Sequence, residues 1–388
     1  MPKQIKVVFS NERLITPSGL NIVGGMLGKS NFVKRCNRIP VDKKRSEHQI
    51  KDGDVLLSYI GLLCQGKVDF EAVREMHDDP DFYESALGIT RSIPSAETLR
   101  QRMDDIGSSL RSQILQANVD MFRTHGVEPS ALDETGEVPV DIDVTPMDNS
   151  KSHKDGVSRT YKGFDGYAPP MAYIGTEGFL VNAELHEGSQ HCQKGMPEFL
   201  RETLRLSHKM TDKQLLIRLD SSNDAKENLG ILLEDGDWFI VKRNLRRGET
   251  KDDWLQLVQD CCKDIRHPRE GKTVYIGSSW KCEQYHSEIK TDMDVERLPS
   301  GKFETNELVL ELTIIAYNLL RMIGQESLKH KPDQKKRVKR RRIRTVIGNM
   351  ILLASHVTTH ARETLMALGR SNTWRFAFMQ TWLRFAAN

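Results

Sequence analysis

The pattern of apolar and polar positions changes character near residue 130. Between residues 46 and 126, apolar side chains recur at helical spacing, as across residues 55–63 and again across 110–122, and predict several short helices. After a polar stretch at 126–136, runs rich in β-branched residues predict strands instead. The predicted strands are 138–145, 171–175, 179–185, 214–220 and 238–243, and the helices among them are 197–206 and 223–233.

The order of these elements indicates an α/β fold. Three strands come first and are followed by helix, strand, helix and strand, while the turn at 175–178 (Gly-Thr-Glu-Gly) predicts an antiparallel hairpin. We therefore expect a mixed five-stranded sheet with flanking helices, which is the RNase H-like order. A strongly apolar helix at 306–322 is shorter than the roughly 20 residues that span a bilayer, so we expect it in the core.

Composition narrows the class of protein only in part. The chain has 388 residues, a length that favours more than one domain, and its net charge of +3 does not identify a partner. Positive charge gathers at 329–344, which suits either a polyphosphate partner or a solvated or localisation-type tract. The six cysteines show no metal-ligand spacing. Without a signal-peptide pattern or a membrane-spanning run, a cytosolic protein is expected.

Three carboxylates in separate segments predict the chemistry. Asp143 lies in the first predicted strand, Asp220 ends the apolar run 215–219, and Glu283 lies on a helical segment seven residues before Lys290, so that Glu283 and Lys290 share a helix face. This order can bring the carboxylates together at one sheet edge. Each close pair would repel by about 4 kcal/mol at an effective dielectric of 20, so the cluster needs protons or cations. Oxygen ligands favour two Mg²⁺ or Mn²⁺ ions, which suit phosphodiester cleavage.

The residues leave several alternatives open. Asp141 competes with Asp143, because residues two apart on a strand point to the same face. Asp224 is expected in the first turn of the next helix, where it complements the helix N-terminus rather than a metal. Trp280 is either a core residue or a platform on which an unpaired base stacks.

Two further segments each have a structural and a DNA-binding interpretation. Residues 93–103 place a Pro and a capping Ser before a basic helix, which is either an ordinary capped helix or the reading helix of a helix-turn-helix. The charged segment 148–170 is either a solvated loop or a flap that contacts DNA.

Four motifs, in this order and spacing, resemble the DDE transposases of bacterial insertion sequences, in the group whose RNase H-like catalytic domain carries a Y-R-E-K helix. The motifs are Asp143-Val144-Thr145, Arg218-Leu219-Asp220-Ser221-Ser222-Asn223-Asp224, Glu283 with Lys290, and Phe303-Glu304-Thr305-Asn306 before Ala316-Tyr317-Asn318-Leu319-Leu320-Arg321. The resemblance implies that Asp143, Asp220 and Glu283 are the catalytic and metal-binding triad, and it favours Asp143 over Asp141. It also implies that Lys290 contacts a phosphate near the transposon end.

The chain departs from this family at two positions. The Tyr and Arg that the family places seven and four residues before its Glu fall at Ile276 and Ser279, and neighbouring Tyr275 and Lys281 are the candidate substitutes. The short stretch between 243 and 280 argues against a large inserted β domain and leaves room for a small insert with a strand at 273–276.

The resulting prediction is a cut-and-paste transposase that cleaves transposon ends and transfers the strand into target DNA. Its partners are double-stranded DNA at inverted-repeat ends and target sites, and pairing of two ends implies a homodimer on DNA, in the cytoplasm of a bacterium and associated with the nucleoid. The alternatives are a domesticated DNA-binding relative and a metal-dependent nuclease that joins nothing. The predicted parts are a helical DNA-binding region at 1–135, the catalytic domain at 136–325, and a basic tract with C-terminal helices at 326–388. The predicted DNA contacts are Lys290, Lys281, Trp280, Arg340, Arg341 and Arg342.

Overall fold

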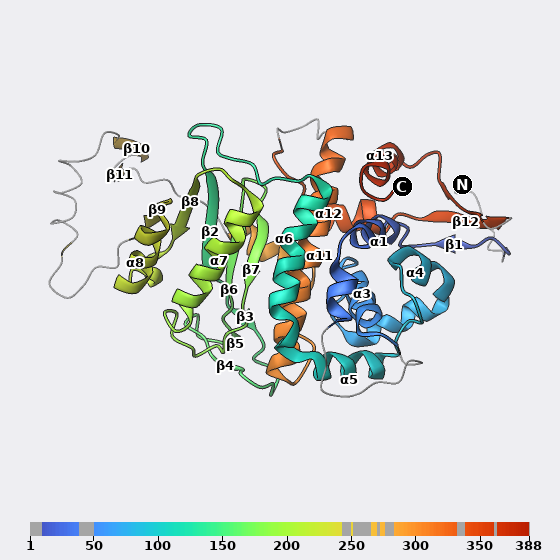
Figure 1. Cartoon of the computed structure of the whole chain (residues 1–388), viewed down its shortest axis with the longest axis horizontal. Coiled ribbons are helices and arrows are strands. Elements are labelled where there is room, and N and C mark those ends of the chain that lie inside the picture. The colour runs from blue at the N-terminus through green and yellow to red at the C-terminus, as the bar shows by residue number, and fades with distance from the viewer. Residues whose placement is uncertain are drawn as a thin grey trace, which may run out of the picture.

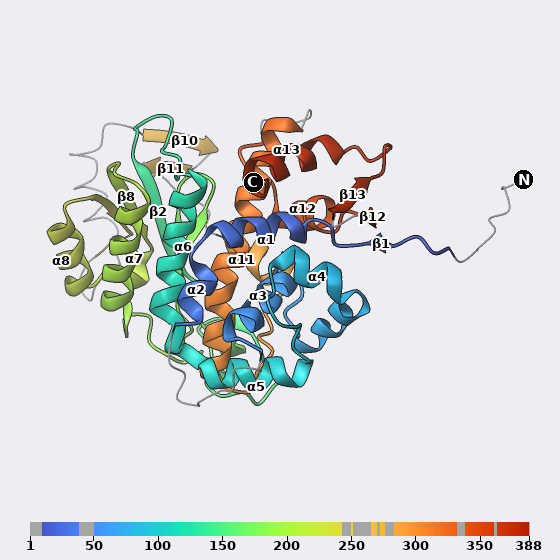
Figure 2. The same cartoon turned by 45° about the vertical axis from the view of Figure 1, so that its right-hand side comes forward.

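The computed structural model describes residues 10–38, 50–242, 250, 265–269, 272–275, 283–331, 338–360 and 363–387. Figure 1 shows a sheet on one side of the molecule, a group of helices on the other, and the long helix α11 (Phe303–His330) between them. In Figure 2 the N-terminal helices and the C-terminal elements lie together, on the side of α11 that faces away from the sheet.

The five-stranded sheet confirms the predicted α/β order. β2 (Val138–Val144) lies at the centre, antiparallel to β6 and parallel to β8, in the strand order β7-β6-β2-β8-β9. β6 and β7 form the predicted hairpin, while β8 and β9 are parallel, so the sheet is mixed as expected. The other strands are β6 (Pro170–Ile174), β7 (Phe179–Ala183), β8 (Leu215–Leu219) and β9 (Trp238–Val241).

Helices cover both faces of this sheet, which explains why every residue of β6 and β7 is buried. On one face, the Asn182 amide of β7 donates a hydrogen bond to the Thr203 hydroxyl of α7 (Met196–Met210), and α8 (Lys226–Asp235) packs beside α7. On the face that carries Tyr173, the rings of Tyr285 and Tyr317 lie 5.0 and 6.3 Å from the Tyr173 ring. Tyr285 belongs to α10 (Glu283–Ser287), which continues into the π-helical turn η4 (Glu288–Asp292).

The helices predicted between residues 46 and 126 are present, and two further helices, α1 (Leu20–Lys29) and α2 (Phe32–Cys36), precede them. The predicted ones are α3 (Asp52–Leu63), η1 (Phe70–Asp78), α4 (Pro80–Leu87), α5 (Ala96–Ile106), η2 (Gly107–Leu110) and α6 (Arg111–His125). The Ser95 hydroxyl caps α5 by accepting a hydrogen bond from the Thr98 backbone N–H at 3.1 Å. Arg102 of α5 pairs with Asp52, and Arg100 pairs with Glu97. The capped helix is thus confirmed, and both arginines already have partners within the protein.

Helix α11 organises the molecule. It contacts β7 of the sheet as well as α3, α5, α6 and α13, and most of its side chains are buried. The apolar segment at 306–322 is therefore core, as predicted, although the helix continues to His330. Within the described residues, no helix is both long and apolar enough to cross a membrane.

The segment at 148–170 is more ordered than a solvated loop. It contains β4 (Ser158–Arg159) and β5 (Asp165–Tyr167), which form a small sheet with β3 (Met147–Asp148) in the order β3-β5-β4. This sheet lies below the main sheet in Figure 1, at the edge where β2 ends. The solvated-loop expectation was wrong because strands of two or three residues are too short to show an alternating pattern.

The remaining elements flank this core. A hairpin of β10 (Ile265–Arg269) and β11 (Lys272–Tyr275) occupies the place of the predicted small insert. Near the C-terminus lie α12 (Ile343–Val346), η5 (Ile347–Ile351), β12 (Ser355–His360), β13 (Glu363–Leu368) and α13 (Arg375–Phe385). β12 pairs with β1 (Leu14–Ile15) and β13, and α13 contacts α1, so the two ends of the described chain pack together.

Candidate active site

The register of the central strands places Asp143 beside Asp220. β2 and β8 are parallel, and Ile142 pairs with Leu219. The next residue after Ile142 is Asp143, and the next after Leu219 is Asp220, so a predicted ligand follows each strand position. Neighbouring strands lie about 4.8 Å apart. Because Asp143 and Asp220 follow residues that are in register, they project from the same face at the carboxyl edge of the sheet.

Asp141 lies two residues before Asp143 and projects from the same face. Its carboxylate pairs with Arg218, its neighbour on β8, with Nε 2.5 Å from Oδ1 and Nη2 2.6 Å from Oδ2. The two side chains are only 8% and 9% exposed. Asp143, by contrast, is half-buried, and its Oδ1 accepts a hydrogen bond from the Val144 backbone N–H at 2.8 Å. The internal pairing of Asp141 favours Asp143 as the carboxylate that meets a ligand.

A tight turn holds the Asp220 carboxylate in one orientation. Oδ1 accepts hydrogen bonds from the backbone N–H and hydroxyl of Ser222 and from the side-chain amide of Asn223. Among the residues that the structure describes, none donates a hydrogen bond to Oδ2, and Asp220 is exposed. One oxygen therefore fixes the side chain, and the described part of the chain leaves the other to an external cation. Asp224 is buried and precedes α8, which begins at Lys226, so its expected place in the first helical turn was wrong.

The helix of Glu283 reaches this edge with its later residues. The Tyr285 hydroxyl donates to the Thr176 carbonyl at 3.4 Å, in the β6–β7 turn at the opposite edge of the sheet. Five residues later, the Lys290 ammonium donates to the Pro146 carbonyl at 2.8 Å, just beyond β2. The structure thus brings Lys290 to the edge that carries Asp143 and Asp220. The Glu283 side chain lies outside the described residues, so its role as third ligand stays a prediction.

With this geometry in place, the comparison with known families is direct. Residues 134–319 match the family described as Transposase DDE domain. The chain carries a transposase DDE domain. The matched range contains Asp143, Asp220 and Glu283, and the match confirms the resemblance to DDE transposases, while membership of the Y-R-E-K group stays a prediction. The origin in a bacterial insertion sequence stays a prediction.

Other comparisons add little to this transposase domain. No curated protein matches the chain. Among solved structures, the chain is similar to the piggyBac transposase in a synaptic complex with hairpin DNA. The identity is 13%, the likeness covers 87% of this chain and 80% of that chain, and the TM-score is 0.39. A likeness at this level supports no further conclusion.

The predicted DNA contacts of the transposase have different surroundings. Trp280 and Lys281 lie outside the described residues, as do Ile276 and Ser279. Lys290 also pairs with Glu296 at 2.9 Å, so a DNA phosphate would compete with that carboxylate.

The three arginines of the basic tract hold the tract against the domain. Arg340 pairs with Glu288 at 2.7 Å and lies over the Tyr285 ring. Arg341 donates to the Ser327 hydroxyl and lies over the Trp374 ring. Arg342 pairs with Asp292 at 2.8 Å, although 53% of its side chain remains exposed. These contacts assign the arginines an internal role, and their contact with DNA stays a prediction.

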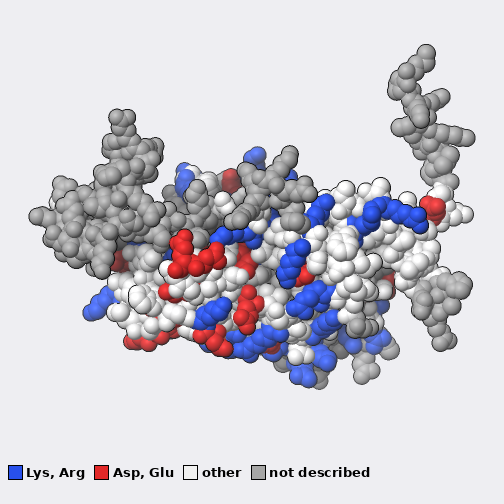
Figure 3. Space-filling view, turned by 90° about the horizontal axis from the view of Figure 1, so that it is seen from above, with Lys and Arg blue, Asp and Glu red and all other residues white. Residues whose placement is uncertain are grey.

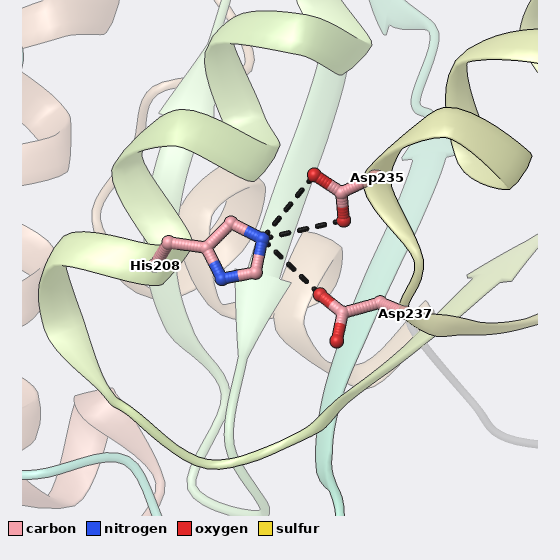
Figure 4. Close-up of side chains that lie close together, drawn as sticks. All are labelled: His208, Asp235 and Asp237. Carbon is pink, nitrogen blue, oxygen red and sulfur yellow. Dashed lines mark hydrogen bonds and ion pairs between the residues drawn. The ribbon is translucent and has the colours of Figure 1, made fainter.

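A second group of possible metal ligands lies at the opposite edge of the sheet. Nε2 of His208 lies 3.2 Å from Oδ2 of Asp235 and 3.2 Å from Oδ2 of Asp237, and one ligand atom from each of the three lies within 4.8 Å of the others (Figure 4). Burial raises the pKa of Asp237, whose Oδ1 accepts a hydrogen bond from the Leu215 backbone N–H. This group was not predictable from the sequence, because its members come from α7, the last residue of α8 and the residue before β9. It is separate from the predicted triad, and ion pairing with His208 accounts for its arrangement.

One face of the molecule carries charges of both signs. Figure 3 views the molecule from the edge of the sheet opposite Asp143 and Asp220, and Lys and Arg side chains are interspersed there with Asp and Glu side chains. This mixture agrees with the small net charge of the whole chain.

Proposed function

We propose that this chain is a cut-and-paste DNA transposase that cleaves the ends of its element and joins them to target DNA. The observation that carries the proposal is the position of Asp143 beside Asp220, at the ends of parallel strands within a transposase DDE domain. The substrates are inverted-repeat ends and target DNA, and the active form is a homodimer that pairs two ends. Such a protein works on nucleoid DNA in the bacterial cytoplasm.

The donor set at this edge fits a hard divalent cation. Asp143 and Asp220 offer carboxylate oxygens, which Mg²⁺ and Mn²⁺ prefer, and Oδ2 of Asp220 accepts no hydrogen bond from the residues that the structure describes. Two ionised carboxylates on neighbouring strands repel by about 4 kcal/mol at an effective dielectric of 20, so a cation between them relieves that repulsion. A bound ion would lower the pKa of an attacking water and stabilise charge on the leaving oxygen.

Side chains around the proposed metal site hold its ligands in position. The turn at Asp220 fixes its carboxylate before any ion binds, and the Asp141–Arg218 pair fixes the strand ends beneath it. Lys290 supplies a cation for a DNA phosphate at the same edge. The proposal also requires the Glu283 carboxylate to reach the pair, and its own variant tests that requirement separately.

Alanine variants of the three carboxylates test the proposal. We expect Asp143→Ala, Asp220→Ala and Glu283→Ala each to lower the single-turnover cleavage of end-containing DNA with Mg²⁺ by at least about 100-fold, since each removes a ligand worth several kcal/mol in the transition state. DNA binding should persist, and EDTA should abolish cleavage by the unaltered protein. Asp133→Ala is the matched control, because that carboxylate is 83% exposed and pairs with Lys339 at the surface. Normal cleavage by Asp143→Ala or Asp220→Ala would show that the proposed site is wrong.

A metal-dependent nuclease that joins nothing is the second candidate, because it would use the same carboxylate pair. Pre-cut ends supplied with target DNA separate the two: the transposase joins them and the nuclease does not. A domesticated relative that only holds DNA is disfavoured, because Asp143 and Asp220 are both present and lie side by side.

A further inference from the structure

Tyr161 is mounted at the tip of the β4–β5 hairpin. The backbone N–H and hydroxyl of Thr160 both donate to the Phe164 carbonyl, at 2.8 and 2.7 Å, and the Gly163 N–H donates to the Thr160 carbonyl at 3.0 Å. Gly163 has a φ of +86°, a conformation that glycine adopts without strain. These hydrogen bonds close a tight turn, so the backbone that carries Tyr161 is held in one place.

From this tip the Tyr161 side chain reaches the predicted catalytic edge. Its hydroxyl donates to the carbonyl of Val144 at 3.3 Å, and Val144 directly follows Asp143. Burial of the hydroxyl and the charges of Asp143 and Asp220 raise the pKa of Tyr161 to about 12, so both carboxylates lie near it. The residue is nevertheless 69% exposed. The polar end of the ring is therefore anchored beside the carboxylates, while much of its aromatic surface faces solvent.

An exposed tyrosine beside a phosphoryl-transfer site has two chemical uses. Attack by its oxygen on phosphorus would form a phosphotyrosine bond and expel a sugar oxygen, and it requires the phenolate. The hydroxyl proton is donated to the Val144 carbonyl, which disfavours that use. Stacking on a nucleobase needs only the ring, and every base offers a π face. Exposed Lys162 on the same hairpin provides positive charge for the adjoining backbone phosphates, whereas Arg159 pairs with Asp165 at 3.6 Å.

We propose that Tyr161 is a stacking platform for the unpaired nucleobase next to the phosphate that lies at Asp143 and Asp220. The inference rests on the proposed function, because it takes the reacting phosphate to lie at this edge. The hydrogen bond to Val144 sets the height of the ring above the edge, and the base covers the open ring face. Since stacking tolerates any base, Tyr161 positions the strand without reading its sequence.

The test pairs two variants with two DNAs. Binding to a pre-cut end without target DNA is measured by fluorescence anisotropy, with either a normal base or an abasic site at the terminal nucleotide. We expect Tyr161→Ala to weaken binding of the normal end by about 10- to 100-fold. Tyr161→Phe, which keeps the ring, should bind within about twofold of the unaltered protein. The abasic end should weaken binding of the unaltered protein as much as Tyr161→Ala does, and combining the two changes should add nothing further.

Three outcomes would overturn the inference. The first is unaltered DNA binding by Tyr161→Ala, and the second is an equal loss of affinity in Tyr161→Phe and Tyr161→Ala. The third is that the loss of affinity from Tyr161→Ala and the loss from the abasic site multiply when the two are combined. Phe376→Ala on α13 is the matched control, because Phe376 is also an exposed aromatic residue, at 60%. Cleavage of uncut ends by Asp143→Ala and Asp220→Ala is measured alongside. If those variants are inactive and Tyr161→Ala is normal, only this inference fails, whereas active aspartate variants would refute the proposed function itself.

Discussion

At the scale of single residues, the buried Asp141–Arg218 pair explains how two nearly equivalent aspartates come to differ. Both project from one face of β2, but a cross-strand arginine is available only to Asp141, because Arg218 lies opposite it on β8. Sequence spacing could not separate Asp141 from Asp143, since the choice depends on the register between two strands. The family motif and this register favour the same residue.

The pair also leads to a prediction about stability. Arg218→Ala should lower the free energy of unfolding by about 3 kcal/mol, because it leaves Asp141 buried without its cation. Urea unfolding followed by circular dichroism measures the change. The double variant Asp141→Leu/Arg218→Met should lose much less, since it buries no charge. An unfolding midpoint for Arg218→Ala equal to that of the unaltered protein would contradict this account.

Glu311 predicts a pH dependence of the free energy of unfolding. Burial raises its pKa from 4.5 to about 8, even though Arg111 lies 3.5 Å away and lowers it. The folded state therefore holds a proton that the unfolded state releases, so this group makes the free energy of unfolding fall as pH rises from about 4.5 to about 8. The slope for one proton is at most about 1.4 kcal/mol per pH unit. Glu311→Gln keeps the shape and removes the charge, and chemical unfolding between pH 5 and 8 should show a flatter slope for it. An unchanged slope would mean that Glu311 ionises normally.

At the scale of elements, the strands and helices of the sheet were predictable because each is long enough to show its period. β2, β7, β8 and β9 fall within the expected ranges, β6 begins one residue before its range, and the Gly-rich turn at 175–178 correctly predicted a hairpin. The small β3-β5-β4 sheet was not predictable, since its strands have two or three residues and depend on pairing across the segment. That sheet is what carries Tyr161 to the catalytic edge.

Helix direction is the other feature that sequence could not supply. The spacing of Glu283 and Lys290 correctly indicated one helical segment, but not which end of it approaches the carboxylates. Hydrogen bonds to Thr176 at one end and Pro146 at the other show that Lys290 reaches that edge. The basic tract shows the same limit of sequence analysis. Its positive charge is visible in the sequence, whereas the ion pairs of Arg340 with Glu288 and of Arg342 with Asp292 depend on the tertiary fold.

At the scale of the whole molecule, metal binding should raise the free energy of unfolding. An ion that binds only the folded state at about ten times its Kd raises the free energy of unfolding by about 1.4 kcal/mol, so Mg²⁺ should raise the Tm by about 2 °C. Differential scanning fluorimetry with Mg²⁺ or EDTA measures this shift.

Asp143→Ala and Asp220→Ala should abolish the shift. Asp143→Ala should also raise the Tm in EDTA, because it removes one of two carboxylates that repel across neighbouring strands. His208→Ala is the control for the other candidate ligand group, and it should leave the Mg²⁺ response unchanged, since a nitrogen ligand suits Zn²⁺ or Ni²⁺ better than Mg²⁺. If His208→Ala removed the response and Asp220→Ala kept it, Mg²⁺ would be binding at the opposite edge of the sheet. The carboxylate pair at the ends of β2 and β8 would then not be the metal site.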